Sequence, residues 1–524
     1  MGTETDYLTK QIIAYIGNKR KLLPLILKAV HNLGIEIKPG LKFFDVFAGS
    51  GVVSRLAKSL NFEVFSNDWE YYSFIINSAY VATNKSEIKD LFGPEDDFKS
   101  LLNKINSLPS PDESKQYIAK YYAPKEFDIN AVDYKTERLF YTRENALAID
   151  KIRNYIEENF DDSNQKRKNL LLAELIYEAA THNNTSGVFK ACHKEFGGHG
   201  KDALKRILGK IELHEPVLID SDFPAHIFQE DANSLVKKMP RVDIAYLDPP
   251  YNQHQYGSNY HLLNTIAKWD KIPEPLELND KGVLKEKAGI RRDWVDTRSH
   301  YCYKDEAISS FSDLIQNLNA RFILISYSTD GIIPFQKMQE ICMEKGKVSI
   351  VTNEYTTYRG GKQSNKRKNT NIEFILCIDT EKKSDAQDEQ NLEAVFLKRK
   401  SELMFRQKYS EKKLKAESES FTENSLEMNL AGKKVTIPTD DFFTLGEPEN
   451  LDSLDLEEVK ILHEKLEKCV LETKEEELSE ILEKIKNQKT QDDKINKFAR
   501  LVPKTLKKLA HKKNREIFYN AWPK

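Results

Sequence analysis

The chain has 524 residues, 40% of them hydrophobic and 31% charged, and its 80 Lys and Arg residues are nearly balanced by 82 Asp and Glu residues. This length predicts two or three domains, and the sequence has no apolar run long enough for a membrane-spanning helix. The five cysteines form no CxxC pair, which disfavours zinc sites and disulfide frameworks. We therefore expect a cytoplasmic protein without metal or membrane partners, in which any contact with nucleic acid depends on local basic patches.

The first part of the chain has the pattern of alternating strands and helices. The strand candidates are short apolar runs, at 41–46, 63–65, 226–228, 242–247 and 321–326. Residues 347–352 and 371–378 can form an antiparallel pair after them. Apolar runs of this length between helical patterns are typical of a mostly parallel sheet with helices on both faces.

A long helical stretch at 86–222 interrupts this pattern, and Leu170–Ala180 is its clearest helix. Because the stretch lies between the second and third strand candidates, we interpret it as an inserted domain. The α/β domain then comprises 10–85 and 223–380.

The character of the chain changes after Asp379. We expect a charged linker at 381–395 and a mainly helical domain at 396–524, with one short β-like piece at 433–437. Residues 454–486 contain neither Gly nor Pro and carry apolar residues at helical spacing. This pattern predicts an amphipathic helix or a helical hairpin.

Two features near the first strands indicate a nucleotide-like ligand. Phe47-Ala48-Gly49-Ser50-Gly51 follows the first strand candidate, where glycines let a ligand approach the backbone and the next helix offers free N–H groups. Asp68 ends the second strand candidate, and an acid there can accept hydrogen bonds from both ribose hydroxyls of a nucleoside cofactor. A tight turn and a helix N-cap are the alternatives, but together the two features favour cofactor binding.

Asp231 follows the third strand candidate and is expected to face the same crevice. Its carboxylate could accept a hydrogen bond from the adenine amino group of the cofactor. Capping of the next helix explains an aspartate at this position nearly as well.

The decisive feature is Asp248-Pro249-Pro250-Tyr251, which follows the apolar strand candidate 242–247. Two prolines fix the backbone and can continue neither a helix nor a central strand. The rigid loop therefore presents a carboxylate, a backbone carbonyl and an aromatic ring together at the end of a strand. A purely structural turn is the alternative, and the cofactor-type turn upstream argues against it.

These motifs resemble the Dam-like, α-group DNA adenine-N6 methyltransferases and the longer modification enzymes of type IIS restriction systems. The resemblance covers about residues 10–380. It assigns contacts with the cofactor to Tyr15, Lys19, Phe47, Gly49, Gly51 and Asp68, and Asp231 is a further cofactor-binding candidate from its position after the third strand candidate. It assigns the catalytic loop to Asp248, Pro249 and Tyr251, and a supporting segment to Ser326-Tyr327-Ser328 with Gly331.

The resemblance implies a Rossmann-like α/β methyltransferase sheet that uses S-adenosylmethionine, with 86–222 as an inserted helical recognition domain. Its expected partners are double-stranded DNA and a cognate restriction endonuclease. A carboxylate and a carbonyl that accept both N–H bonds of the adenine amino group would localise the nitrogen lone pair and stabilise the growing charge. The base would have to leave the duplex, at a cost of a few kcal/mol, and stacking on Tyr251 would return about 1–3 kcal/mol.

Three basic stretches are candidates for DNA contact, at 194–210, 285–298 and 358–368. The third is the most convincing, because it lies in a predicted hairpin beside the sheet. Its candidate residues are Arg359, Lys362, Lys366 and Arg367. Solvated charged loops are the alternative for all three stretches.

Other functions compete with this interpretation. N4-cytosine enzymes favour Ser-Pro-Pro-Tyr, and enzymes that act on protein glutamine favour Asn-Pro-Pro-Tyr. A non-catalytic DNA-binding subunit with a vestigial cofactor fold is a further alternative, which the intact motifs disfavour. Asp440 with Glu458 and Lys460 faintly resembles a nuclease pattern, but Glu458 falls in a predicted helix where a strand is needed.

Overall fold

The computed structural model describes residues 2–352, 372–405, 407–422, 424–439 and 444–487. The chain divides into two compact units, 1–351 with 375–383, and 352–374 with 384–524. The four candidate DNA contacts Arg359, Lys362, Lys366 and Arg367 lie outside the described residues.

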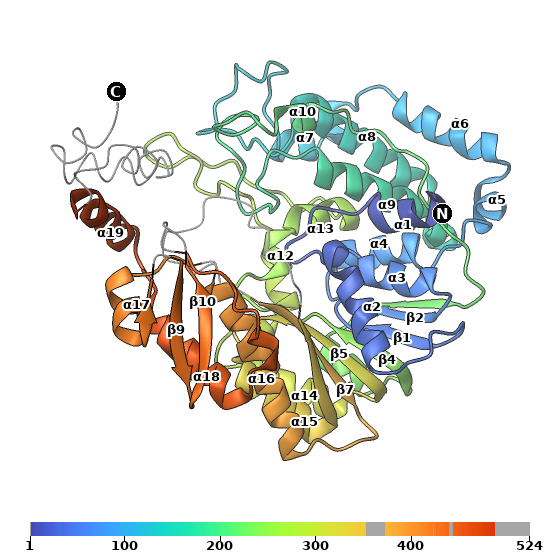
Figure 1. Ribbon diagram of the computed structural model, residues 1–524. Coiled ribbons are helices and arrows are strands. Elements are labelled where there is room, and N and C mark those ends of the chain that lie inside the picture. The colour runs from blue at the N-terminus through green and yellow to red at the C-terminus, as the bar shows by residue number, and fades with distance from the viewer. Residues whose placement is uncertain (1, 353–371, 406, 423, 440–443, 488–524) are drawn as a thin grey trace. The chain divides into compact units, whose positions relative to one another are not determined.

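The sheet has seven strands in the order β3-β2-β1-β4-β5-β7-β6 (Figure 1). The bounds are β1 (Lys42–Asp45), β2 (Glu63–Asn67), β3 (Ala225–Phe228), β4 (Val242–Leu247), β5 (Ala320–Ser328), β6 (Lys347–Thr352) and β7 (Glu373–Asp379). β1 pairs in parallel with both β2 and β4, while β2 pairs with β3 and β4 with β5. The predicted mostly parallel sheet is therefore confirmed, and β6 and β7 are neighbours as expected.

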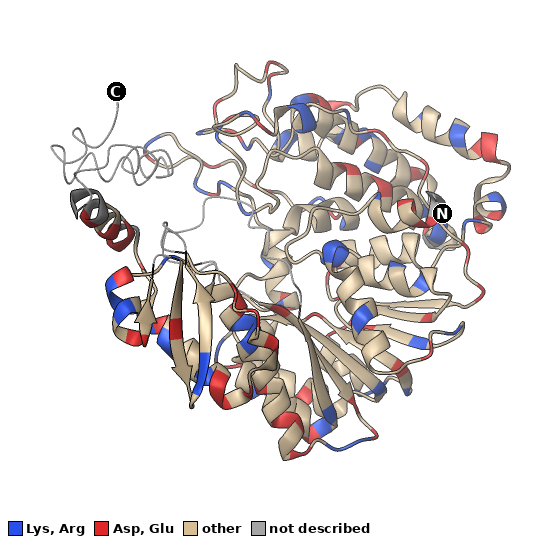
Figure 2. Ribbon diagram, in the orientation of Figure 1, with Lys and Arg blue, Asp and Glu red and all other residues tan. Residues whose placement is uncertain are grey.

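The described part of the first unit contains fifteen α-helices in addition to the sheet. The charged residues of this unit lie mainly on helices and loops (Figure 2). Their bounds are α1 (Gly2–Thr9), α2 (Leu23–Asn32), α3 (Val52–Ser59), α4 (Tyr71–Tyr80), α5 (Glu87–Phe92), α6 (Glu95–Asn106), α7 (Ile118–Tyr121), α8 (Arg143–Asn159), α9 (Gln165–Thr181), α10 (Leu204–Ile207), α11 (Ala232–Val236), α12 (Tyr256–Asn259), α13 (His261–Lys268), α14 (Ala307–Asn317) and α15 (Phe335–Lys345).

Helices α2 and α3 cover one face of the sheet. Apolar residues at helical spacing on α2, such as Leu23, Ile26 and Val30, form one cluster with Phe43 of β1 and Ile244 of β4. Each such side chain contributes about 1.5–3 kcal/mol on burial. The α/β core therefore fixes β1 and β4 side by side, and these two strands lead into the glycine turn and the Asp248 loop.

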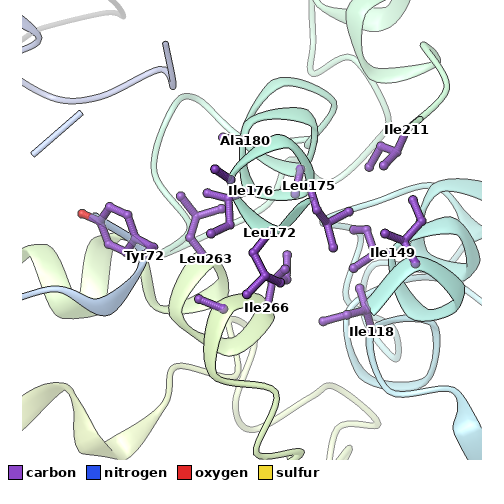
Figure 3. Close-up of a cluster of buried hydrophobic side chains, with 14 of the residues drawn as sticks. Tyr72, Ile118, Ile149, Leu172, Leu175, Ile176, Ala180, Ile211, Leu263 and Ile266 are labelled. Atoms are coloured by element: carbon purple, nitrogen blue, oxygen red, sulfur yellow. The ribbon is translucent and has the colours of Figure 1, made fainter. Parts of the chain in front are cut away.

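The helical insertion shares its core with the α/β domain (Figure 3). Leu172 and Ile176 of α9 belong to the same buried cluster as Tyr72 of α4 and Leu263 and Ile266 of α13. The predicted helix at 170–180 is confirmed as part of α9. Because α13 follows the Asp248 loop closely in the chain, the insertion packs on elements that carry the site.

The second unit contains a three-stranded antiparallel sheet in the order β10-β9-β8. Its elements are α16 (Ala386–Met404), α17 (Glu411–Glu417), β8 (Ser420–Phe421), β9 (Ser425–Leu430), β10 (Lys433–Pro438), α18 (Leu456–Cys469) and α19 (Lys474–Asn487). Capping boxes begin α16 at Asp385 and α18 at Asp455. The predicted helical pattern at 454–486 is two helices, and α16 occupies most of the stretch 381–395 expected as a linker.

Two observations concern the nuclease pattern considered above and membrane-spanning helices. Glu458 is the N3 residue of the capping box of α18, and Lys460 lies in the same helix, so neither belongs to a strand of a nuclease core. No helix in the described part of the chain is long and apolar enough to cross a membrane.

Candidate active site

A cavity of about 640 Å³ opens where β1, β2, β3 and β4 end. Residues that directly follow these strands line it, among them Phe47, Asp68, Asp231 and Asp248. The chain proceeds from β1 to one side of the sheet and from β4 to the other, and such a crevice is where open α/β sheets bind ligands. The volume lies in the range of small-molecule sites, about 300–1,000 Å³.

The glycine turn after β1 is held in a conformation that requires glycine. Gly49 and Gly51 have φ of +52° and +76°. A Cβ on Gly49 would lie 2.7 Å from the Tyr15 ring, and one on Gly51 would lie 2.5 Å from Asn77. The backbone therefore approaches its neighbours closely at both positions, and Gly49 lines the cavity.

Asp68 lies directly after β2 and fixes the turn. Its Oδ2 accepts a hydrogen bond from Gly49 N at 2.8 Å, and its Oδ1 accepts one from Glu70 N at 2.9 Å. Burial raises the pKa of Asp68, and these backbone donors oppose the increase. Each carboxylate oxygen keeps lone pairs for a ligand in the cavity, so the residue fits the predicted ribose contact.

Glu70 is a pocket residue that the sequence did not reveal. Its side chain is 4% exposed, accepts hydrogen bonds from Asn264 Nδ2 at 2.6 Å and Thr297 Oγ1 at 2.8 Å, and lines the cavity. Burial raises its pKa to about 7. Its two partners lie 194 and 227 residues away in the chain, so no local pattern marks Glu70 as part of the site.

Asp231 caps a helix and also borders the cavity. Its Oδ1 caps α11 by accepting hydrogen bonds from Ser234 N at 2.9 Å and Ser234 Oγ at 2.8 Å. The residue also lines the cavity. Nearby, Tyr301 donates a hydrogen bond to Asn233 Oδ1 at 2.7 Å, and its ring stands edge-on to Phe47 at 5.4 Å. Phe47 and Tyr301 thus form an aromatic corner suited to a flat ring.

The Asp248 loop begins where β4 ends and borders the same cavity, since Asp248 and Pro250 line it. No hydrogen bond from the described residues reaches the Pro249 carbonyl. Tyr251 is half-buried, and its carbonyl accepts a hydrogen bond from Ile332 N at 3.0 Å. The Tyr251 ring stands edge-on to Tyr327 at 6.0 Å. A carboxylate, a carbonyl and a ring are therefore presented together.

The segment that the resemblance assigned a supporting role lies behind Tyr251. Tyr327 accepts a hydrogen bond from Ile333 N at 3.1 Å through its hydroxyl, and Gly331 donates one to Ser328 O at 3.0 Å. A side chain at Gly331 would overlap the Tyr327 ring. This turn therefore fixes the ring against which Tyr251 packs.

Lys19 lies beside the Asp248 loop. Its Nζ forms an ion pair with Asp248 Oδ1 at 2.8 Å, donates a hydrogen bond to Gly17 O at 3.0 Å and lies 5.5 Å from the centre of the Tyr251 ring. The residue is 6% exposed. Burial raises the pKa of Asp248, and the Lys19 charge opposes that increase. Lys19 therefore favours an ionised carboxylate in a buried position.

Tyrosines hold the segment that carries Lys19. Tyr260 accepts a hydrogen bond from Ile16 N at 2.7 Å, and Tyr256 donates one to Ile16 O at 3.3 Å. The Tyr15 ring stacks on Tyr260 at 4.8 Å between ring centres, and the Tyr15 hydroxyl accepts a hydrogen bond from the Tyr72 hydroxyl at 3.2 Å. The helix after the catalytic loop thus fixes the backbone next to Lys19.

The two described basic stretches differ in the burial of their basic side chains and in the acidic partners that these side chains bind. In the stretch 285–298, Arg291 is 4% exposed and forms two hydrogen bonds with Asp270 at 2.8 and 2.6 Å. In the stretch 194–210, Lys201 pairs with Glu195 at 3.1 Å, while the short helix α10 carries Lys205 and Arg206 (Figure 2). Arg291 is therefore a structural residue and not a phosphate contact.

No group of three or more His, Cys, Asp or Glu side chains in the described residues is placed to hold a metal ion.

Comparison with known proteins agrees with this geometry. Residues 15–308 match the family described as D12 class N6 adenine-specific DNA methyltransferase. The chain is 32% identical over 363 residues to the type II methyltransferase M.NlaIII of Neisseria lactamica, with 69% of this chain and 96% of that protein covered.

Two further relatives are longer than the matched region. The modification methylase StsI of Streptococcus sanguinis is 32% identical over 369 residues, which cover 69% of this chain and 51% of that protein. The type II methyltransferase M.FokI of Planomicrobium okeanokoites is 31% identical over 372 residues, which cover 70% and 52%. The chain thus matches about half the length of these two proteins.

Proposed function

The chain belongs to the D12 class N6 adenine-specific DNA methyltransferases, and we propose that it methylates a flipped-out adenine in a specific duplex sequence with S-adenosylmethionine as donor. The observation that carries the proposal is that Asp68 and Asp248 line one cavity. A nucleoside held at Asp68 and a base amino group held at Asp248 would therefore meet.

The residues of the cavity fit the proposed cofactor. The side-chain-free turn at Gly49 and Gly51 leaves room for close approach, Asp68 offers acceptors for two hydroxyls, and Phe47 with Tyr301 offers an aromatic corner. Tyr15 and Asp231 also line the cavity. When bound, S-adenosylmethionine supplies an electrophilic sulfonium methyl group.

The chemistry at the acceptor follows from the Asp248 loop. We infer that the Asp248 carboxylate and the Pro249 carbonyl each accept one N–H bond of the adenine amino group, which localises the nitrogen lone pair. The positive charge that develops on this nitrogen is stabilised by the carboxylate, and the methylated amine then releases one of its protons to water. A base in a duplex cannot reach the loop, so it must be extruded, and Tyr251 offers the ring on which it stacks.

We further propose that the enzyme protects sites against a cognate restriction endonuclease. Its relatives are named as type II methyltransferases and modification methylases, which supports this role. Single-molecule sequencing of DNA from cells that express the chain would identify the modified base and its sequence context. Modified cytosine, or the absence of a fixed sequence, would contradict the proposal.

The catalytic assignment is tested by Asp248→Ala. Loss of a group that stabilises charge in the transition state should lower the turnover rate by about 10²–10³, while cofactor binding, measured by calorimetry, stays close to that of the wild type. A variant that methylates adenine at the wild-type rate would refute the assignment.

A further inference from the structure

The lining of the cavity carries a strong excess of negative charge. Six acidic residues line the cavity, and among the described residues no lysine or arginine does. Three of the acids pair, at 2.8 to 3.0 Å, with a lysine outside the lining: Glu230 with Lys238, Asp248 with Lys19, and Asp313 with Lys237. The other three form no ion pair with a described residue, and they are Asp68, Glu70 and Asp231. The cavity therefore favours a ligand with positive charge.

Glu70 is the unpaired acid for which the cofactor contacts considered so far provide no role. The residue is 4% exposed, and its hydrogen bonds from Asn264 Nδ2 at 2.6 Å and Thr297 Oγ1 at 2.8 Å come from neutral donors. A Cβ on Gly257 of α12 would lie 3.0 Å from Glu70 Oε1, so this helix packs directly on the carboxylate. Neutral donors compensate only part of the free energy needed to bury a charge. An unmatched carboxylate therefore remains at the cavity wall.

The charged and titratable groups around Glu70 do not match its charge. Burial raises the pKa of Glu70 to about 7, Asp68 adds to the increase, and Lys268 of α13 opposes it. The Nζ atom of Lys268 already pairs with Asp293 at 2.8 Å. Burial, with Asp68 and Glu70, raises the pKa of Tyr72 on α4 well above its ordinary value, so the phenol is neutral. At neutral pH the Glu70 carboxyl is thus about half ionised.

Glu70 lies next to the residue that fits the ribose of the cofactor. Its backbone N donates a hydrogen bond to Asp68 Oδ1 at 2.9 Å, and both residues line the cavity. In S-adenosylmethionine the sulfonium sulfur is bonded directly to the 5′ carbon of the ribose, whereas the ammonium group is at the far end of the methionine chain. A sulfonium has no N–H or O–H bond to donate, so a nearby negative charge is the group that recognises it.

We propose that Glu70 is a specificity-determining residue that favours the sulfonium cation of S-adenosylmethionine over the neutral thioether of the product, S-adenosylhomocysteine. The inference rests on the proposed function, since it takes S-adenosylmethionine as the ligand of the cavity. After methyl transfer the sulfur carries no charge, and its attraction to the carboxylate is lost. Glu70 therefore strengthens the binding of the donor relative to that of the product.

The first test is proton release on binding, because a cation beside a half-ionised carboxyl displaces its proton. Titration calorimetry of the full chain at pH 7, in two buffers with different heats of ionisation, gives the number of protons released. S-adenosylmethionine should release up to about half a proton per wild-type chain, and S-adenosylhomocysteine clearly less. Because His300 also lines the cavity, the titrations are repeated with Glu70→Gln, in which this difference should disappear.

The same titrations give the affinities. Glu70→Gln should weaken the binding of S-adenosylmethionine on the order of tenfold and that of S-adenosylhomocysteine less than about threefold. Asp150→Asn is the matched control. Asp150 is 0% exposed, accepts hydrogen bonds from Ile118 N at 2.8 Å and Ala119 N at 2.9 Å, and has a pKa that burial raises to about 7, but it lies outside the cavity lining. The control should keep the wild-type affinity ratio and proton release.

Equal proton release with the two ligands, or an unchanged affinity ratio in Glu70→Gln, would overturn the proposal. A parallel loss of affinity for both ligands would also overturn it, since Glu70 would then act on a part that the ligands share. The wild-type comparison requires no variant and decides the question if Glu70→Gln does not fold. A wild-type protein that binds neither ligand, or that methylates no adenine, would instead refute the proposed function, so the two failures are distinguishable.

Discussion

Replacement of Lys19 by methionine should change the pH dependence of methyl transfer more than its maximum rate. Methionine keeps the length and apolar character of the lysine side chain but removes the charge that lies 2.8 Å from Asp248 Oδ1. Burial raises the pKa of Asp248, and Lys19 opposes that increase. Without Lys19 the Asp248 carboxylate is protonated at a higher pH. A protonated Asp248 has no negative charge with which to stabilise the positive charge that develops on the adenine amino nitrogen.

The size of the effect follows from the distance between the charges. Coulomb's law at 2.8 Å gives about 1.5 kcal/mol in water and about 6 kcal/mol at an effective dielectric constant of 20. Because both side chains are less than one fifth exposed, the lower figure is a minimum. The acid limb of the activity profile should therefore move upward by at least about one pH unit.

The assay is the single-turnover rate of methyl incorporation into a saturating duplex between pH 5 and 9. Lys21→Met is the control, since Lys21 is exposed in the same short helical segment, Lys19–Leu22. We expect Lys19→Met to be slow at neutral pH and to recover as the pH rises, while the control follows the wild type. A rate reduced equally at every pH would show that Lys19 does not act through the ionisation of Asp248.

Three further predictions concern two residues that line the cavity, Asp68 and Glu70, and one that holds a neighbouring segment, Tyr260. Asp68→Ala should weaken the binding of S-adenosylhomocysteine about 10- to 100-fold in calorimetry, because charge-assisted hydrogen bonds are lost; unchanged binding would remove Asp68 from the site. Glu70 has a folded-state pKa raised from 4.5 to about 7, so its burial costs stability that grows from pH 4.5 to 7, up to about 3 kcal/mol. Glu70→Gln should abolish that part of the pH dependence of urea unfolding, and parallel curves for the two proteins would contradict the assignment. Tyr260→Phe leaves Ile16 N without its acceptor and should lower the free energy of unfolding by about 1–3 kcal/mol; equal stability would show that another acceptor replaces the hydroxyl.

The parts of the site that could be predicted from the sequence are those in which structure and chemistry depend on adjacent residues. Asp248-Pro249-Pro250-Tyr251 is one example, because the prolines and the preceding strand fix the loop locally. The glycine turn after β1 is another, since Gly49 and Gly51 adopt φ values that other residues rarely adopt. These motifs predicted the crevice that β1, β2 and β4 form together.

The remaining features depend on residues far apart in the chain. Tyr260 meets Ile16 across 244 positions, and Glu70 meets Thr297 across 227. Arg291 looked like a phosphate contact in a basic stretch, but Asp270 lies 21 residues away and binds it. Such pairings depend on how distant segments of the chain pack together, which a single sequence does not encode in any short pattern.

Residues 256–261, which comprise helix α12 and the start of α13, connect the segment next to the Asp248 loop with the loop 183–198 of the insertion. On one side, Tyr256 and Tyr260 hold Ile16, close to Lys19 and hence to Asp248. On the other, Asn259 and His261 hold both backbone groups of Phe189 in the 183–198 loop. A displacement of this loop would therefore be transmitted to α12 through two hydrogen bonds at a buried residue. Because a protein interior resists deformation, the position of the loop and the alignment of the Asp248 loop should be coupled.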